Sequence, residues 1–157
     1  MPVTTVRALD PWPAVRPGDR SRPVGTLQHL LNEHGHDLDV DASCGPLTEA
    51  AVRTSQRDLG LVVDGVVGPR TWDALVVTVT NGHHGHAVRG AQAKLAARTG
   101  SLVVDGVFGA RTEAAVRELQ LALSTFGVLV DGVVGPLTWR AMVSGMASGM
   151  VSGTVCS

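Results

Sequence analysis

Four copies of one short phrase constrain the fold more than any other feature of this chain. The phrase pairs Asp with Gly, continues to a second Gly, and reaches a Thr three residues later. Clear copies are LVVDGVVGPRTW (61–72), LVVDGVFGARTEAAV (102–116) and LVDGVVGPLTWRAMV (129–143), and a degraded copy is LDVDASCGPLTEAAV (38–52). Such internal repetition indicates repeated structural units and has to be settled before a fold is assigned.

The four copies form two pairs. Asp41 and Asp105 are 64 residues apart, and so are Gln28 and Gln92. Two independent markers with one spacing predict two copies of a unit of roughly 60 residues, near the lower size limit for independent folding. We place the modules at 18–80 and 87–145, with an N-terminal extension at 1–17, a solvated His-rich linker at 81–86 and a flexible Gly/Ser tail at 146–157.

Each phrase changes from a valine-rich to a helical composition after its second Gly. Pro is favoured at the first position of a helix, and Thr, Glu and Ala follow it readily. We therefore predict an all-α fold of two tandem three-helix bundle modules with short loops, with helices at 22–34, 46–58, 69–77, 87–98, 110–124 and 136–145. The Asp-Gly pair would form the tight loop before a helix. Minor two-residue β pairings, such as LVV against LDV, remain open because both stretches are rich in β-branched residues.

The residues shared by the two modules form a longer pattern. It runs apolar-x-x-Leu-Gln, then Asp-Gly-x-apolar-Gly-x-x-Thr-x-x-Ala-Val, then apolar-Gln, then Gly-Leu-x-x-Asp-Gly-x-x-Gly-x-x-Thr-Trp-x-x-Leu. This pattern resembles the peptidoglycan-binding domain of the small three-helix type (the PGBD-like superfamily), which occurs in bacterial cell-wall hydrolases and in spore or phage lysins. The first module matches at Leu27, Gln28, Gly45, Thr48, Ala51, Val52, Gln56, Gly60, Leu61, Asp64, Gly65, Gly68, Thr71, Trp72 and Leu75. The second matches at Gln92, Asp105, Gly106, Phe108, Gly109, Thr112, Ala115, Val116, Leu119, Gln120, Asp131, Gly132, Gly135, Thr138 and Trp139.

Several positions depart from that pattern. Ala42 and Cys44 weaken the first loop, Ser55 replaces an aromatic residue, and Ala91 stands where Leu is expected. The stretch LSTFGVL is also longer than its counterpart LGL. These departures leave open whether both modules bind a ligand.

Trp72 and Trp139 are candidate ligand contacts because they occupy equivalent positions in the last helix of each module. Aromatic faces stack on sugar rings, and an indole N–H can donate to a glycan or peptide oxygen. The alternative is that both rings fill a core that has few other aromatic residues.

Charged residues around the repeated loops are the other candidates. Arg70 and Arg111 follow the second glycines and could pair with carboxylates of a stem peptide. Asp64 and Asp105 are further candidates for ligand binding. The alternatives are a solvated first helical turn for the arginines and a turn-forming role for the aspartates.

Two stretches, one acidic and one rich in histidine, have some features of metal sites. DLDVDASCGPLT begins like a calcium loop, but Ala42 and Thr48 occupy the positions that need Gly and Glu. The histidines of HHGH (83–86) have no Asp or Cys at a suitable spacing to complete a zinc site. We predict no metal and no cofactor.

Catalytic patterns are likewise not found in the sequence. There is no Gly-x-Ser-x-Gly motif and no Cys and His constellation, and Cys44 occupies the core position taken by Val67 and Phe108 in other copies. We therefore expect a protein that is not an enzyme and has no catalytic residues. Pairing of Cys44 with Cys156 stays open.

Charge and hydropathy limit the partners. A net charge of -1 does not indicate a nucleic-acid binder. No stretch has the length of a signal-peptide core or of a membrane span, so we expect no membrane insertion and leave the export route open.

The resemblance implies non-catalytic binding of peptidoglycan, through its glycan or its stem peptide, in the bacterial cell wall or outside the cell. The alternative is a structural or adaptor subunit of a phage-like or secretion particle, in which the modules bind a protein partner. Such a subunit would be cytoplasmic or particle-associated until release. An autonomous hydrolase is the least favoured of the three.

Overall fold

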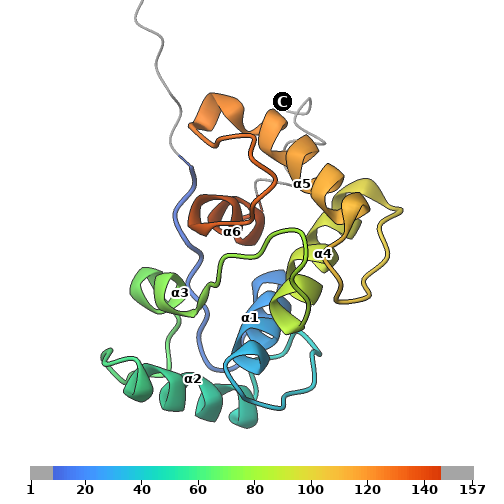
Figure 1. The fold of residues 1–157 in the computed structure, drawn as a ribbon. Helices are drawn as coiled ribbons and strands as arrows, with labels where there is room; N and C mark the ends of the chain where they lie inside the picture. Colours follow the sequence, from blue (N-terminus) through green and yellow to red (C-terminus); the bar gives the residue numbers. More distant parts are fainter. Residues whose placement is uncertain (1–8, 146–157) are drawn as a thin grey trace, which may run out of the picture.

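The computed structural model describes residues 9–145, and these form six α-helices and one short 3-10 helix (Figure 1). The elements are α1 (Arg22–Glu33), α2 (Pro46–Asp58), α3 (Pro69–Leu75), α4 (His86–Thr99), α5 (Ala110–Ala122), η1 (Ser124–Phe126) and α6 (Pro136–Val143). Each module contributes three α-helices, so the all-α prediction is confirmed. The observed helix bounds lie within two residues of the predicted ones.

The second helix of the first module and the third helix of both modules begin at a proline. Pro46, Pro69 and Pro136 occupy the first turn, and the preceding residue is an extended glycine without a side-chain cap. A proline at this position costs no hydrogen bond, because the first N–H groups of a helix have no partner within the helix. The Gly-Pro pairs in the sequence therefore fix where these helices start.

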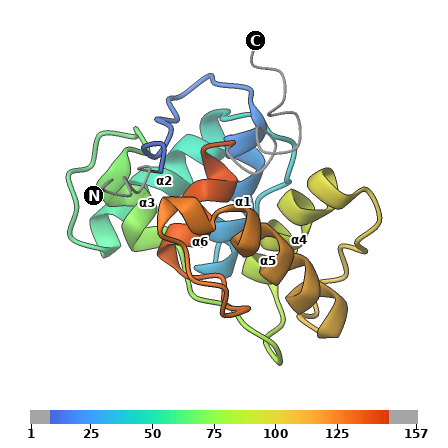
Figure 2. The same cartoon turned by 90° about the horizontal axis from the view of Figure 1, so that it is seen from above.

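The first helices of the two modules, α1 and α4, pack against each other more extensively than any other pair of helices (Figures 1 and 2). A Cβ atom placed on Gly90 would lie only 3.1 Å from the Cβ of His29, so the glycine allows the two helices to approach closely. The buried apolar residues of both modules form one continuous cluster. The tandem modules therefore share a hydrophobic core.

A short segment precedes the first helix of each module, at residues 13–20 and 77–84, and we call these the lead-in segments. Each makes two isolated antiparallel bridges to the repeated loops of the helices that follow it. The bridges are Val15 to Val67, Arg20 to Ser43, Val79 to Val134 and His84 to Val107. The two lead-in segments are related by the same spacing of 64 residues as the rest of the repeat.

These bridges correct one prediction. The β pairings join loops to the lead-in segments, not LVV to LDV. Residues 81–86, predicted as a solvated linker, have exposed histidine side chains. Gly82 N–H donates to Phe108 O at 3.0 Å, and Phe108 N–H donates to His83 O at 2.9 Å, so the backbone of this stretch is part of the second module.

The described part of the N-terminal extension packs on both modules. Trp12 stacks on Trp72 with ring centroids 5.4 Å apart, and its indole donates to Asp73 at 2.9 Å. The guanidinium of Arg140, on α6, donates to the carbonyl oxygens of Asp10 and Leu9. The extension therefore closes the shared core. The predicted flexible tail at 146–157, with Cys156, lies outside the described residues.

Candidate functional site: four helix entrances

Each Asp-Gly phrase forms a loop that leads into a helix, and we call these loops the helix entrances. The four entrances span residues 41–48, 64–71, 105–112 and 131–138. A glutamine from the preceding helix is buried against each one. These glutamines are Gln28, Gln56, Gln92 and Gln120, and each is 1% exposed.

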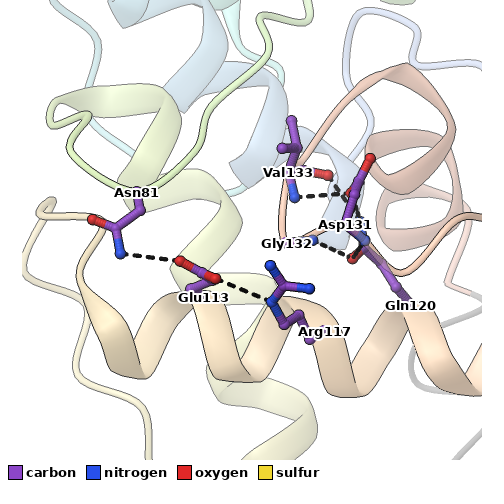
Figure 3. Close-up of polar contacts among 7 residues, drawn as sticks. All are labelled: Asn81, Glu113, Arg117, Gln120, Asp131, Gly132 and Val133. Atoms are coloured by element: carbon purple, nitrogen blue, oxygen red, sulfur yellow. Dashed lines mark hydrogen bonds and ion pairs between the residues drawn. The ribbon is translucent and has the colours of Figure 1, made fainter.

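The fourth entrance shows the hydrogen bonding clearly (Figure 3). The side-chain amide of Gln120 donates to Asp131 Oδ1 at 2.9 Å and to Val133 O at 2.9 Å. Its Oε1 accepts the backbone N–H groups of Asp131 at 3.1 Å and Gly132 at 2.9 Å. Asp131 Oδ1 also accepts the N–H of Val133 at 3.0 Å. One buried glutamine thus satisfies donors and acceptors of the whole turn.

The same network recurs at the other three entrances. Each glutamine amide donates to the loop aspartate, to the carbonyl two residues further on, and to the hydroxyl of a buried threonine in the first turn of the next helix. Two amide hydrogens are therefore shared among three acceptors. Because buried polar groups are costly when unpaired, this network fixes each turn and the helix that follows it.

Hydrogen bonding lowers the pKa of three loop carboxyls. At Asp64 and Asp105 the first cause is the backbone N–H of Val66 or Val107, followed by the glutamine amide. At Asp41 the amide of Gln28 comes first. Hydrogen bonds to a carboxylate favour its charged form. The predicted turn-forming role of Asp64 and Asp105 agrees with these contacts, and both residues are exposed at the surface.

An arginine covers the glycine of three entrances. A Cβ atom on Gly65 or Gly132 would lie 3.1 Å from Nε of Arg53 or Arg117. Arg89 covers Gly106 in the same way, at 2.9 Å. These glycines adopt positive φ angles, so an added side chain would be strained as well as crowded.

The first entrance differs at both of these positions. Gly25 occupies the place of the covering arginine, and Ala42 occupies the place of the glycine. Ala42 still adopts φ of 59°, and its N–H still donates to Gln28 at 3.0 Å. A Cβ atom on Gly25 would lie 4.0 Å from that of Ala42. The degraded first loop therefore retains the turn.

The entrances carry exposed apolar side chains beside their aspartates. The pairs are Val62 and Val63, Val103 and Val104, and Leu129 and Val130. In the second module, Val103 and Leu129 line two grooves at separate entrances, of about 380 Å³ and 230 Å³. Asp105 and Arg111, two of the predicted site residues, line the larger groove together with Val103 and Val107.

The other predicted arginine, Arg70, is exposed in the first turn of α3, at the position equivalent to Arg111. Leu47 and Leu137 occupy this position in the remaining entrances. Both leucines are exposed. The four entrances thus share the same hydrogen-bonded turn. At this one position, two of them expose an arginine and two expose a leucine.

Trp72 and Trp139 lie in the core and are fully buried. Their indole N–H groups donate to backbone oxygens of the lead-in segments, Pro13 O and Val77 O, each at 2.7 Å. The predicted stacking on a sugar ring therefore has no exposed ring face to act through. Both tryptophans instead hold the lead-in segments against the last helix of each module.

Cys44 is buried, as predicted for a core side chain. Burial raises the pKa of its thiol, and the charges of Asp19 and Glu49 act in the same direction. Over residues 9–145 no group of three or more His, Cys, Asp and Glu side chains is arranged to hold a metal ion. Within the same range, no helix is both long and apolar enough to cross a membrane.

The sequence pointed to the glutamines only as markers of the repeat. The sequence did not reveal that each glutamine side chain holds its loop by several hydrogen bonds. The regular placement of a glutamine before each Asp-Gly pair was the only indication of this role. The partners of the amide are mainly loop backbone atoms, which a sequence pattern does not display.

Comparison with known proteins assigns the two modules to a family. The family model described as "Putative peptidoglycan binding domain" matches residues 20–75 and 84–142, which is more than half of the chain. A zinc D-Ala-D-Ala carboxypeptidase of Streptomyces albus G is 34% identical over 124 residues, covering 77% of this chain and 44% of that protein. The N-acetylmuramoyl-L-alanine amidase CwlM of Mycobacterium tuberculosis is 32% identical over 155 residues, covering 82% of this chain and 37% of that protein.

One solved structure is also similar to part of this chain. The endolysin of Burkholderia phage AP3 is 29% identical and superimposes with a TM-score of 0.41 over 69% of this chain and 38% of that chain. The chain spans less than half the length of each of these three proteins.

These relatives correct one prediction. The sequence led us to expect a protein that is not an enzyme, whereas the curated relatives are named as a carboxypeptidase and an amidase. The prediction was wrong because it depended only on catalytic patterns within this chain, which spans less than half the length of those relatives. The two matched segments coincide with the two sets of three helices, and the chain belongs to the peptidoglycan-binding domain family in tandem.

Proposed function

We propose that the chain attaches to peptidoglycan through the exposed surfaces of its helix entrances. The observation that carries the proposal is the groove of about 380 Å³ at the third entrance, where an anionic side chain, a cationic side chain and exposed valines meet. Asp105 would accept hydrogen bonds from ligand N–H or O–H groups, and Arg111 would bind a carboxylate. Asp64 and Arg70 would do the same at the second entrance.

The two tryptophans have an indirect part in this proposal. Trp72 and Trp139 would support the site from inside, because each fixes a lead-in segment that bridges two entrances. Family membership supports a ligand in the bacterial wall, and the names of the relatives support a system that acts on peptidoglycan. We place the protein at the cell wall, where the entrances would hold it while the wall is processed.

Two modules in one chain can raise apparent affinity if both reach the polymer at once. The proposal therefore assigns a contact to each of the two arginine-bearing entrances. Loss of one arginine should weaken binding, and loss of both should weaken it further.

Co-sedimentation with purified sacculi tests the proposal. The variants are Arg70→Ala, Arg111→Ala and the double variant, with Arg57→Ala, an exposed arginine near the end of α2, as the matched control. A hydrogen bond to a charged group contributes about 1.5–3 kcal/mol, so each single variant should bind roughly tenfold more weakly and the double variant roughly a hundredfold more weakly. The control should bind like the wild type.

Wild-type protein that stays in the supernatant would contradict the proposal. A stoichiometric protein partner recovered under the same conditions would then favour the adaptor function. Release of soluble muropeptides, measured in the same tubes, reports on hydrolysis separately from attachment.

A further inference from the structure

A second pocket lies between the two modules, apart from the grooves at the helix entrances. It has a volume of about 620 Å³, which is within the range of ligand sites. Residues of α1, of α4 and of the end of α6 surround it, so neither module could form it alone. Its walls carry small apolar side chains, among them Pro23, Val40, Ala93 and Ala97.

One wall of the pocket is at the position where the first entrance lacks a covering arginine. Gly25 lines the pocket, whereas Arg53, Arg89 and Arg117 stand at the equivalent positions and lie over their loops. Ala42 places a methyl group where the other loops have glycine. An arginine at position 25 could not lie over that methyl group in the same way, and its long side chain would extend into the pocket.

The lining favours an anionic ligand. Among the described residues that line the pocket, Lys94 and His29 are the only ionisable ones, and none is Asp or Glu. Hydroxyl groups of Thr26 and Ser144 add polar contacts. A carboxylate bound beside Lys94 would gain a charge-assisted hydrogen bond in a partly desolvated site.

The lining disfavours a sugar. Glycan recognition commonly uses an exposed aromatic face, and none of the described residues that line this pocket is aromatic. The tryptophans of the described residues are all buried. Small apolar walls with a cation instead suit a peptide that has methyl side chains and free carboxylates, as in the alanine-rich stem peptides of peptidoglycan.

We propose that this inter-module pocket binds the stem peptide of peptidoglycan, with its alanine methyl groups against Val40, Ala93 and Ala97 and a carboxylate at Lys94. The proposal rests on the proposed function and assigns the peptide part of the wall to a site that only the tandem arrangement creates. The helix entrances would contact the wall independently of it.

Titration with soluble stem peptide, released from sacculi by an amidase, tests the proposal on the full chain by calorimetry. Gly25→Arg should fill the pocket and weaken binding by at least about tenfold. Ala114→Arg, at an exposed position within α5, is the matched control, because it adds the same side chain away from the pocket. Arginine favours a helix over glycine, and circular dichroism of both variants checks that they are folded.

The charge at the pocket is tested separately. Lys94→Ala should weaken binding of the peptide roughly tenfold, and Lys94→Arg should restore most of it. Amidation of the peptide carboxylates should reproduce the loss with wild-type protein. Equal affinity of wild type and Gly25→Arg for the peptide would overturn the proposal.

Sacculus binding distinguishes this proposal from the proposed function. If the wild type sediments with sacculi but does not bind soluble stem peptide, the pocket inference fails and wall attachment stands. If the wild type binds neither, the proposed function fails as well.

Discussion

Glu33, near the end of the first module's leading helix, accepts a hydrogen bond from the backbone N–H of Ala87, at the start of the second module's leading helix, across 2.8 Å. The carboxylate thus caps α4, whose own N-cap residue, Gly85, offers no side chain. A negative charge at a helix N-terminus is also stabilised by the helix dipole.

We expect Glu33→Ala to lower the free energy of unfolding by about 1 kcal/mol, the usual effect of losing an N-cap. Glu33→Gln should retain part of the stabilisation, because it keeps an acceptor oxygen. Urea denaturation followed by circular dichroism measures the change. Glu118→Ala, at an exposed position of α5, serves as the control.

The buried glutamines should be much less tolerant of substitution. Gln120→Leu removes the acceptor for two loop N–H groups and the donor to Asp131, so we expect a loss of about 3 kcal/mol of unfolding free energy. Leu121→Ala, at the exposed neighbouring position, should change stability by no more than about 0.5 kcal/mol. Equal midpoints of urea denaturation for these two variants would contradict the role of Gln120 in holding its loop.

Ala42 offers a substitution that should stabilise the protein. Its φ of 59° is unfavourable for a residue with a Cβ atom, and Ala42→Gly should gain about 1 kcal/mol by relieving that strain. Ala114→Gly, at an exposed position within α5, should instead lose about 0.5–1 kcal/mol. Thermal denaturation of the two variants should show shifts of opposite sign.

Acid should destabilise the entrances. The pKa of Asp105 is lowered from 3.8 in the folded state. Its contribution to the free energy of unfolding is therefore fully present above the pKa of the unfolded state, and it is lost as the pH falls through the pKa of the folded state. Asp105→Asn keeps an oxygen acceptor and should show a shallower decline of the urea midpoint below about pH 4. Asp39→Asn, at an exposed position outside the hydrogen-bond network, should decline like the wild type.

His29 should add a second pH dependence at the interface between the modules. Its pKa is lowered from 6.5 by burial first, and then by the positive charges of His86 and Arg89. Lys94, which lines the same pocket, adds another cation on α4. The unfolded state then takes up the proton more readily, so stability is complete above about pH 6.5 and falls as the pH drops.

Replacing this histidine tests that expectation. His29→Gln should flatten the dependence of the urea midpoint on pH between about 7 and 5. His84→Gln, at an exposed position, should leave it unchanged. A wild-type midpoint that is constant over this range would show that His29 does not couple protonation to folding.

Local signals explain why the helices could be predicted from the sequence. Gly-Pro pairs and apolar periodicity act within one turn, so the starts of α2, α3 and α6 followed from Pro46, Pro69 and Pro136. The spacing of the repeat also placed Asp105 and Arg111 near one loop, and they do line one groove.

Long-range packing explains what the sequence did not reveal. The burial of Trp72 and Trp139 depends on lead-in segments about 60 residues away, whose bridges leave no periodic pattern. The close approach of His29 to Gly90 is likewise set by how two modules dock. The inter-module pocket follows from that docking and from the single glycine at position 25.

The shared core of α1 and α4 determines how the two halves can act on a polymer. Because these helices bury one another's apolar faces, the separation between equivalent entrances is set by side-chain packing and not by the reach of a tether. Under the proposed function, simultaneous binding by both modules would depend on the periodicity of the target, because a fixed separation matches only one spacing of binding sites. A wall whose repeat does not match that interval would meet one half of the molecule at a time.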